Sequence, residues 1–289
     1  FRNSEEISML IDRLMLIIDQ IIENHNITVC DIDIIPEEEY QKVVLAFNDT
    51  SSESKRDKCI HELFSEQAMK TPGKTALVFE DKRLTYKQLD EMSDSLAHYL
   101  REEKGIRQND IVPIISKRSR HFVTAMLGVM KAGGAYMPVD PSYPSDRIEY
   151  MLKEAGAKVA LVCGYTGNLP VEAICLEAFD YNSFCKAVTN INYPDDKCYV
   201  LFTSGSTGKP KAVMISHNNL SNFVDKNNKS NVYQRDMVNL CNTVLALTTF
   251  SFDISVFEIF LSLINGLRVV LSDEEENLSA ELLAKLIIE

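Results

Sequence analysis

Short apolar runs alternate with stretches of helical periodicity from Cys59 to the end of the chain. Strands joined through helices pair in parallel, because the crossover helix covers a face of the sheet. The alternation therefore predicts an α/β fold with mostly parallel sheets that are flanked by helices. Strands are expected over residues 111–115, 136–139, 159–162, 199–202, 244–247 and 269–271, and helices over residues 122–130 and 147–152 and after Ser216, Asp253 and Asn277.

A hairpin and a capped helix are expected near the start of this region. Residues 75–79 and 84–86 are strand-like runs on either side of a polar, turn-like segment, which predicts a β-hairpin. Thr85 and Gln88 have the spacing of a capping box, and a helix with one apolar face is expected to follow them.

The first 57 residues differ in character from the rest. Apolar residues recur at helical spacing over residues 3–24, which predicts an amphipathic helix that needs a partner to pack against. Residues 25–57 are polar and acidic, as in an interdomain linker. We expect residues 1–57 to be the end of a preceding domain plus an acidic linker, and residues 58–289 to form a second domain. Because the last residues lie inside a helical pattern, we expect a fragment that is cut at both ends.

The net charge of −12 argues against nucleic acid and anionic membranes as partners, because both are bound through basic surfaces. No apolar run approaches the roughly 20 residues that span a bilayer. The residues after Phe1 do not form a signal peptide pattern. These features predict a cytoplasmic protein.

Seven cysteines form no Cys-x-x-Cys pair, and no histidine stands near them at the spacing of a zinc motif. Free cysteines are usually buried core residues. We therefore expect buried, reduced thiols and no metal site.

A loop rich in glycine and hydroxyl side chains, Thr-Ser-Gly-Ser-Thr-Gly-Lys-Pro-Lys at 203–211, follows the apolar run at 199–202. Glycines let backbone N–H groups approach an anion, hydroxyls donate to phosphate oxygens, and lysines supply positive charge. The loop is not a Walker A motif, because only two residues separate its glycines and Pro210 follows the first lysine. A phosphate-binding loop is one interpretation, and a polar surface loop is the other.

This loop resembles the phosphate loop of the adenylate-forming superfamily. Three further segments resemble core motifs of these enzymes: Leu-Thr-Tyr-Lys-Gln-Leu at 84–89, Met-Lys-Ala-Gly-Gly-Ala-Tyr-Met-Pro-Val-Asp at 130–140 and Phe-Asp-Ile-Ser at 252–255. Residues 58–289 are thus similar to the N-terminal part of an adenylation domain of a nonribosomal peptide synthetase. The segment before them resembles the last helix of a condensation domain and its linker. The resemblance implies the adenylate-forming fold, truncated before the end of its large N-terminal subdomain.

The resemblance also implies roles for single residues. The β- and γ-phosphates of ATP would be held by a loop whose members are Thr203, Ser204, Gly205, Ser206, Thr207, Gly208 and Lys209. Donors aimed at the leaving pyrophosphate would stabilise the charge that it gains in the transition state. Ala212 stands where the family usually has glycine. The catalytic lysine and the magnesium-binding glutamate are expected beyond Glu289, so the fragment is assigned no catalytic residue, no metal ligand and little or no turnover alone.

Asp253 is expected to select the class of substrate. Its carboxylate would pair with the α-ammonium group of an amino acid, a contact that a fatty or aryl acid cannot make. From the residues alone, the favoured explanation of Asp253 is the N-cap of the following helix, and only the resemblance favours the substrate role. Ile254 and Phe257 fall where the family lines its side-chain pocket, and their alternative is the core face of a helix.

A histidine and a basic cluster are two further candidate sites. His217 follows the strand that returns from the loop and is interpreted as structural, with a position near the nucleotide as the alternative. Arg118, Arg120 and His121 suggest an anion site but are interpreted as the solvated start of a helix.

The implied reaction joins an amino acid to AMP from Mg-ATP with release of pyrophosphate, as in secondary-metabolite biosynthesis. The aminoacyl group then passes to a phosphopantetheine thiol. The implied cofactors are ATP, Mg²⁺ and phosphopantetheine, and the implied partners are a peptidyl carrier domain and a preceding condensation domain. One alternative is an acyl-CoA or aryl-acid ligase of the same superfamily, and another is a non-catalytic segment that docks a neighbouring domain.

Overall fold

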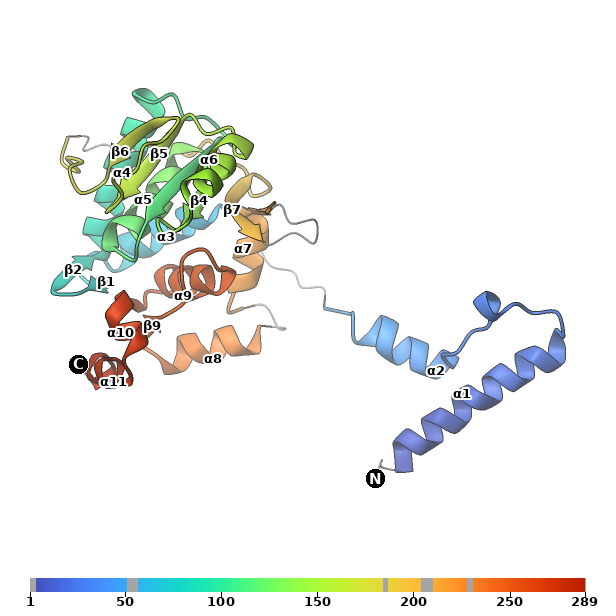
Figure 1. Cartoon of the computed structure of the whole chain (residues 1–289). Coiled ribbons are helices and arrows are strands. Elements are labelled where there is room, and N and C mark those ends of the chain that lie inside the picture. The colour runs from blue at the N-terminus through green and yellow to red at the C-terminus, as the bar shows by residue number, and fades with distance from the viewer. Residues whose placement is uncertain (1–3, 51–56, 184–186, 204–209, 228–230, 289) are drawn as a thin grey trace. The chain divides into compact units, whose positions relative to one another are not determined.

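The computed structural model describes residues 4–50, 57–183, 187–203, 210–227 and 231–288 (Figure 1). Contacts between residues divide the chain into two compact units, an N-terminal unit of Phe1–Glu53 and a main unit of Ser54–Glu289. No helix in the described ranges is both long enough and apolar enough to cross a membrane.

The N-terminal unit is a helix followed by a segment that folds back on it. The helix predicted over residues 3–24 is α1, Ser4–Glu23, and the stretch predicted as a linker contains short helical turns. Gln20 exchanges two hydrogen bonds with the backbone of Asp33, at 2.8 and 2.9 Å. Arg13 donates from Nε to Glu39 at 2.9 Å. The turns are η1 Val29–Asp31, α2 Glu37–Tyr40 and the π-helix η2 Gln41–Ala46.

The apolar residues that make α1 amphipathic remain exposed in the described residues. Ile11 and Leu14 are 54% and 55% exposed. The folded-back segment therefore leaves much of this apolar surface open. The other exposed apolar residues of α1 are Ile7, Met9, Leu10, Met15, Ile18, Ile21 and Ile22.

The larger sheet of the main unit has the order β6–β5–β3–β4–β7–β8. Its first five strands are parallel, and β8 runs antiparallel to β7. β6 was not predicted, because its four residues carry only one buried side chain. The strands are β3 Ile111–Ser116, β4 Ala135–Val139, β5 Val159–Cys163, β6 Glu172–Cys175, β7 Lys197–Thr203 and β8 Lys211–Ser216.

Both faces of this sheet are buried, which explains why its strands read as unbroken apolar runs. Ile114 and Leu161 face the main core, whereas their neighbours Ile115 and Val162 face a second core beneath helix α6. At the edge of the sheet, β8 pairs with β7 alone among the described strands and exposes Val213 and Met214.

The smaller sheet has the order β2–β1–β10–β9, with β1, β10 and β9 parallel. The predicted hairpin is confirmed as the antiparallel pair β1 and β2. The Tyr86 hydroxyl, fully buried at the start of α4, donates to the Leu267 carbonyl at 2.7 Å just before β10. The strands are β1 Thr75–Phe79, β2 Lys82–Thr85, β9 Thr243–Ala246 and β10 Arg268–Leu271.

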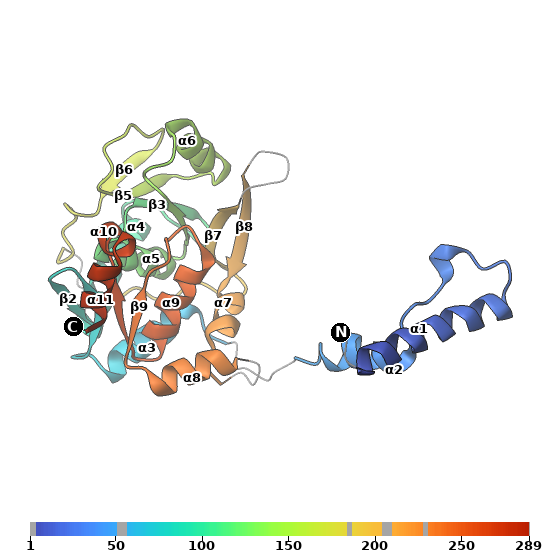
Figure 2. The ribbon, with the colours of Figure 1, turned by 60° about the horizontal axis from the view of Figure 1, so that its bottom comes forward.

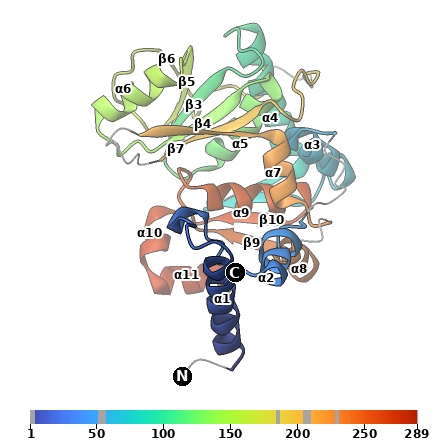
Figure 3. The same cartoon turned by 90° about the vertical axis from the view of Figure 1, so that its right-hand side faces the viewer.

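Helices fill the space between the sheets and cover the outer face of the larger one. Helix α5 contacts strands of both sheets and packs along α4, and α9 lies on β9 and β10, as Figure 3 shows. The predicted capping box of α4 is confirmed, since Thr85 and Gln88 exchange hydrogen bonds at 2.9 and 3.2 Å. The helices are α3 Ile60–Lys70, α4 Tyr86–Glu102, α5 Arg120–Ala132, α6 Ser145–Glu154, α7 His217–Val224, α8 Val232–Leu240, α9 Asp253–Ile264, α10 Glu274–Leu278 and α11 Ala280–Ile288.

The helix expected after Asn277 is confirmed as α11, but the short helix α10 before it was not predicted. Helix α10 is capped by Asp273 and Glu276 through mutual hydrogen bonds of 2.7 Å. One expectation from the sequence is wrong here. The cysteines are not all buried: Cys59, Cys163 and Cys198 are, but Cys30, Cys175 and Cys241 are exposed, because they lie on short or peripheral elements. Cys185 lies outside the described residues.

A buried lysine joins α4 to α5. Lys131, 4% exposed, donates to the carboxylates of Asp90 at 2.6 Å and Asp94 at 2.7 Å. Its ammonium group also lies 5.7 Å from the centre of the Phe64 ring. Burial raises the pKa of Asp94, and the nearby Lys131 charge opposes that rise.

Arg118 connects the two sheets and is not the solvated residue that the sequence suggested. Its guanidinium donates to the carbonyls of Ala246, Thr248 and Ser272, the last at 2.7 Å. It also lies 5.1 Å from the centre of the Phe250 ring. Because Arg118 stands two residues after the end of β3 at Ser116, it joins the carboxyl end of the larger sheet to that of the smaller one.

We expect Lys131→Met to lower the free energy of unfolding by up to about 3 kcal/mol, since it leaves two carboxylates without their partner. Lys87→Met is the matched control, because Lys87 pairs with Glu91 at 3.7 Å on the exposed face of α4. That change should cost about 0.5 kcal/mol or less. Urea unfolding measures both, and equal losses would contradict the structural role given to Lys131.

We expect Arg118→Lys to lower the unfolding free energy by about 1.5–3 kcal/mol, because one ammonium cannot span three carbonyls that a planar guanidinium reaches together. Arg83→Lys on the exposed strand β2 serves as the control and should change it by less than about 0.5 kcal/mol. A melting temperature of Arg118→Lys equal to that of the control would refute the role of Arg118.

Candidate functional site

The carboxyl ends of the parallel strands carry the residues expected to act on substrate. In sheets of this kind, ligands bind outside these ends. Strand β7 ends at Thr203, where the glycine-rich loop begins, and β9 ends at Ala246, from which the chain runs to Asp253 at the start of α9.

Only the base of the predicted phosphate loop is described. Strands β7 and β8 form a hairpin in which Thr203 pairs with Lys211, and Figure 2 shows the two strands side by side. Thr203 is exposed at its end. The predicted ligands Ser204, Gly205, Ser206, Thr207, Gly208 and Lys209 lie outside the described residues.

Ala212 fits the backbone that it occupies. It pairs with Phe202 in the regular part of the hairpin. Among the described residues, only Glu80 and Asn109 are non-glycine residues with positive φ. A glycine is therefore not required at this position by backbone geometry.

Asp253 is not the N-cap of α9, so that alternative from the sequence is wrong. The N-cap position is occupied by Phe252, and Asp253 is the first helical residue, with an exposed side chain. A carboxylate in the first turn of a helix is favoured by the partial positive charge there. Burial mainly raises the pKa of Tyr199, and the charges of Cys198 and Asp253 raise it further. The Asp253 carboxylate therefore lies within electrostatic reach of strand β7.

Apolar side chains follow Asp253 along α9. Phe257 lies one turn further along α9, and its ring is 5.3 Å from that of Phe223 on α7 and 5.9 Å from that of Tyr233 on α8. Ile254 is 55% exposed beside it. Neither Phe223 nor Tyr233 was singled out from the sequence, because only the packing of three helices brings them to Phe257.

The segment that leads to Asp253 is held from two sides. Arg118 donates to the carbonyl of Thr248, and Glu258 on α9 accepts from the Thr248 backbone N–H at 3.1 Å and from its hydroxyl at 2.9 Å. The Ser255 hydroxyl donates to the carbonyl of Phe252 at 2.6 Å. The carboxylate is thus presented by a segment whose position is set by several hydrogen bonds, as a binding group requires.

His217 is fully buried at the first turn of α7. Ser216 caps this helix, as predicted, by accepting from the Asn219 N–H at 3.1 Å. Burial lowers the pKa of His217 to about 4, opposed by the charge of Asp196, so the imidazole is neutral near pH 7. Its ring meets that of His61 edge-on, with the ring centres 5.2 Å apart. A position near the nucleotide stays a prediction.

A cleft of about 360 Å³ lies at the carboxyl ends of β3, β4 and β9. Lys117 and Glu274 form an ion pair of 2.9 Å on its wall. None of the described residues predicted to bind substrate lines it. The lining includes Arg118, Asp140, Thr249, Phe250, Ser251 and Asn277.

Comparison with known proteins identifies the family to which the chain belongs. A family model described as AMP-binding enzyme matches residues 64–289. Bacitracin synthase 1 of Bacillus licheniformis is 37% identical over 283 residues, which is 97% of this chain and 5% of the synthase. The chain thus spans a small part of the curated relative that it matches.

Two solved structures show similar folds. The nonribosomal peptide synthetase FmoA3, in its AMPPNP-bound form, has a TM-score of 0.83 and 24% identity over 99% of this chain and 30% of that chain. The N-terminal subdomain of NpsA from Klebsiella oxytoca, in complex with 3-hydroxybenzoyl-AMSN, has a TM-score of 0.66 and 26% identity over 77% of this chain and 56% of that chain.

These matches confirm the adenylate-forming α/β fold and the resemblance to nonribosomal peptide synthetases that the sequence motifs indicated. The family model covers most of the main unit, including both sheets. The chain belongs to the AMP-binding enzyme family, and its similarity within that family is to the adenylation domains of nonribosomal peptide synthetases.

Proposed function

We propose that the protein containing this chain activates an amino acid with ATP, forming aminoacyl-AMP and pyrophosphate, and passes the aminoacyl group to the phosphopantetheine thiol of a carrier domain. The observation that carries the proposal is the Asp253 carboxylate, exposed at the start of α9 beside the apolar surface of Ile254 and Phe257. A charged group next to an apolar surface suits a ligand with an ammonium group and a side chain.

In the proposed reaction, the carboxylate oxygen of the amino acid attacks the α-phosphorus of ATP, and the bond from that phosphorus to pyrophosphate breaks. Asp253 holds the ammonium group and Ile254 and Phe257 contact the side chain. The loop from Thr203 to Lys209 holds the β- and γ-phosphates and stabilises the charge of the leaving pyrophosphate. The exposed end of β7 at Thr203 supports this arrangement.

Mg²⁺ enters this proposal only as the ATP complex. In the described part of the chain, the one cluster of potential metal ligands consists of cysteine and histidine side chains. Mg²⁺ prefers oxygen ligands, so this cluster does not fit it. We assign no residue of the chain to Mg²⁺.

We also propose that this chain has a condensation domain as its neighbour in the same polypeptide. The exposed apolar face of α1 supports a neighbouring condensation domain, of which residues 1–57 would be the end. We place the reaction in the cytoplasm, consistent with the free thiols of the described cysteines.

An aryl-acid ligase is the second candidate, since the N-terminal subdomain of NpsA is bound to a 3-hydroxybenzoyl compound. An aryl acid has no ammonium group for Asp253 to bind. The two candidates therefore differ in whether activation requires an amino group and the Asp253 charge. A docking segment without catalysis would bind no nucleotide, which an ATP titration tests.

We expect Asp253→Asn to lower kcat/KM for amino-acid-dependent ATP–pyrophosphate exchange by about 10- to 100-fold, the worth of one charge-assisted hydrogen bond. The assay uses the full natural polypeptide that carries this sequence, with amino acids and their des-amino analogues. Asp146→Asn is the matched control, because Asp146 is an exposed carboxylate in the first turn of α6.

The control should keep full exchange, and the des-amino analogues should be poor substrates of the unchanged protein. If the Asp253→Asn variant keeps its exchange activity with des-amino or aryl acids, the protein is an aryl-acid ligase and the proposal is wrong. Absence of both exchange and ATP binding would favour the docking segment.

A further inference from the structure

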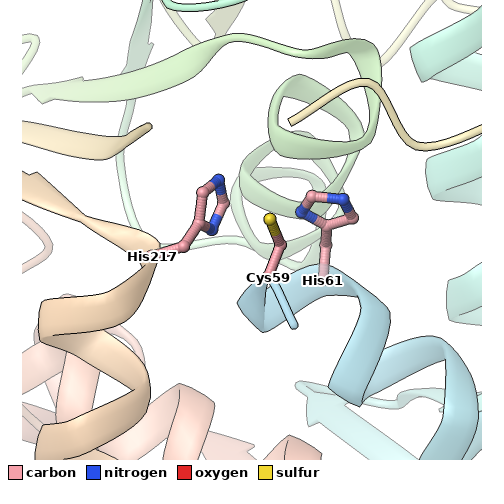
Figure 4. Close-up of side chains that lie close together, drawn as sticks. All are labelled: Cys59, His61 and His217. Atoms are coloured by element: carbon pink, nitrogen blue, oxygen red, sulfur yellow. The ribbon is translucent and has the colours of Figure 1, made fainter. Parts of the chain in front are cut away.

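Three soft donor side chains meet in the core of the main unit. The ligand atoms of Cys59, His61 and His217 all lie within 4.8 Å of one another, and all three residues are buried. Figure 4 shows the Cys59 sulfur between the two imidazoles, with one ring nitrogen of His61 turned toward it. Cys59 and His61 come from the start of α3 and His217 from the start of α7, so the spacing rules applied to the sequence could not detect the group.

Both imidazoles have a buried nitrogen without a hydrogen-bond partner. The Nδ1 atoms of His61 and His217 are inaccessible to solvent and make no hydrogen bond. His61 is 4% exposed and His217 0%. Burial lowers the pKa of His61 to about 3 and of His217 to about 4, so both rings are neutral and have one lone pair each. Unpartnered buried polar atoms are rare in native proteins and call for an explanation.

The surrounding side chains orient these donors as outer partners orient metal ligands. Asn190 Oδ1 lies 3.1 Å from His61 Nε2, so an Nε2–H donating to it leaves the Nδ1 lone pair facing the cluster. The same amide lies 4.0 Å from the Cys59 sulfur through its Nδ2. Asn192 lies 3.2 Å from His217 Nε2, and its own Oδ1 has no partner. The positions of the amide oxygen and nitrogen of Asn192 can be exchanged. Asn192 Oδ1 then accepts from the Nε2–H of His217, so His217, like His61, carries its proton on Nε2 and has a lone pair on Nδ1.

We propose that Cys59 Sγ, His61 Nδ1 and His217 Nδ1 bind one thiophilic d¹⁰ cation, Zn²⁺ or Cu⁺. Cysteine thiolate and neutral imidazole are the ligands that such ions prefer. Bonds of about 2.3 Å to sulfur and 2.0–2.1 Å to nitrogen place tetrahedral donors about 3.3–3.6 Å apart. The three ligand atoms lie within 4.8 Å of one another, so they need to close by at most roughly 1.5 Å. This site is independent of the proposed function.

Binding requires the thiol to lose its proton. Burial raises the pKa of Cys59 to about 12, so the free site holds a thiol, and the proton leaves to solvent as the metal–sulfur bond forms. No oxidation or reduction takes place. Asp196 supplies a negative charge within reach of both Cys59 and His217, and it is held by Gln108 at 2.6 Å and Asn109 at 2.7 Å. This charge offsets the positive charge that Zn²⁺ with one thiolate retains.

The site would join the start of α3 to the start of α7. Helix α7 directly follows β8, the strand that returns from the glycine-rich loop. A bound ion therefore fixes the base of that hairpin against the helix layer, and it should raise the melting temperature of the chain.

The first test titrates the reduced, chelator-treated 289-residue chain with Zn²⁺ against a chromophoric chelator, and in a second arm with Cu⁺ under anaerobic conditions. We expect one ion per chain and a raised melting temperature. Loss of an outer partner of a metal ligand costs about 10- to 100-fold in affinity, so Asn190→Ala should raise the Kd by that factor. Cys59→Ser and His217→Gln remove ligands and should each raise it by at least about 100-fold.

Cys163→Ser is the matched control, because it changes a buried thiol on β5 away from the cluster. A triple Ser variant of the exposed Cys30, Cys175 and Cys241 removes adventitious surface binding. Both controls should bind like the unchanged chain. Circular dichroism checks that each variant folds.

X-ray absorption of the loaded, unchanged chain needs no variant and should show one sulfur and two imidazole nitrogens around the ion. No binding in either arm, a coordination shell without sulfur, or an unchanged Kd in folded Cys59→Ser would overturn the proposal.

Discussion

One guanidinium group sets how the carboxyl ends of the two sheets meet. Arg118 stands just after β3 and donates to carbonyls at the ends of β9 and β10 and in the segment after β9. One charged side chain thereby binds three backbone acceptors at and just beyond the ends of these strands. Glu258 holds one of these residues, Thr248, from its other side, by accepting from the Thr248 backbone N–H and hydroxyl. The position of Asp253 at the start of α9 depends on this clamp, because the chain reaches Asp253 directly from it.

Most helices and strands of the fold could be predicted from local patterns in the sequence. Most strands of both sheets, although not β6, follow from apolar runs. The β1–β2 hairpin and the caps at Thr85 and Ser216 follow from side chains that act within four residues. Arg118 was misread because its partners are more than 120 residues away, and the convergence of His61 and His217 was missed for the same reason. Asp253 was found through a motif, whereas the aromatic residues beside Phe257 required the packing of α7, α8 and α9.

The fold of the chain and the groups that would select its substrate are known from different observations. The family match supplies the AMP-binding fold, which many acids and acceptors can share. The choice among acids depends on single groups, and in the proposed function the exposed Asp253 carboxylate would distinguish an amino acid from an aryl acid. The clamped segment before α9 keeps this group in place before substrate arrives, so less ordering is needed on binding.

Among the described strands, β8 pairs only with β7, so its outer edge is open in this part of the chain. Val213 and Met214, which point to opposite faces of the sheet, are both exposed on it. An open strand edge with apolar side chains is a template onto which a further extended segment can add through main-chain hydrogen bonds. Concentrated solutions of the chain should therefore be prone to edge-to-edge association, and the exposed Lys211 at the start of the strand is the natural gatekeeper against it.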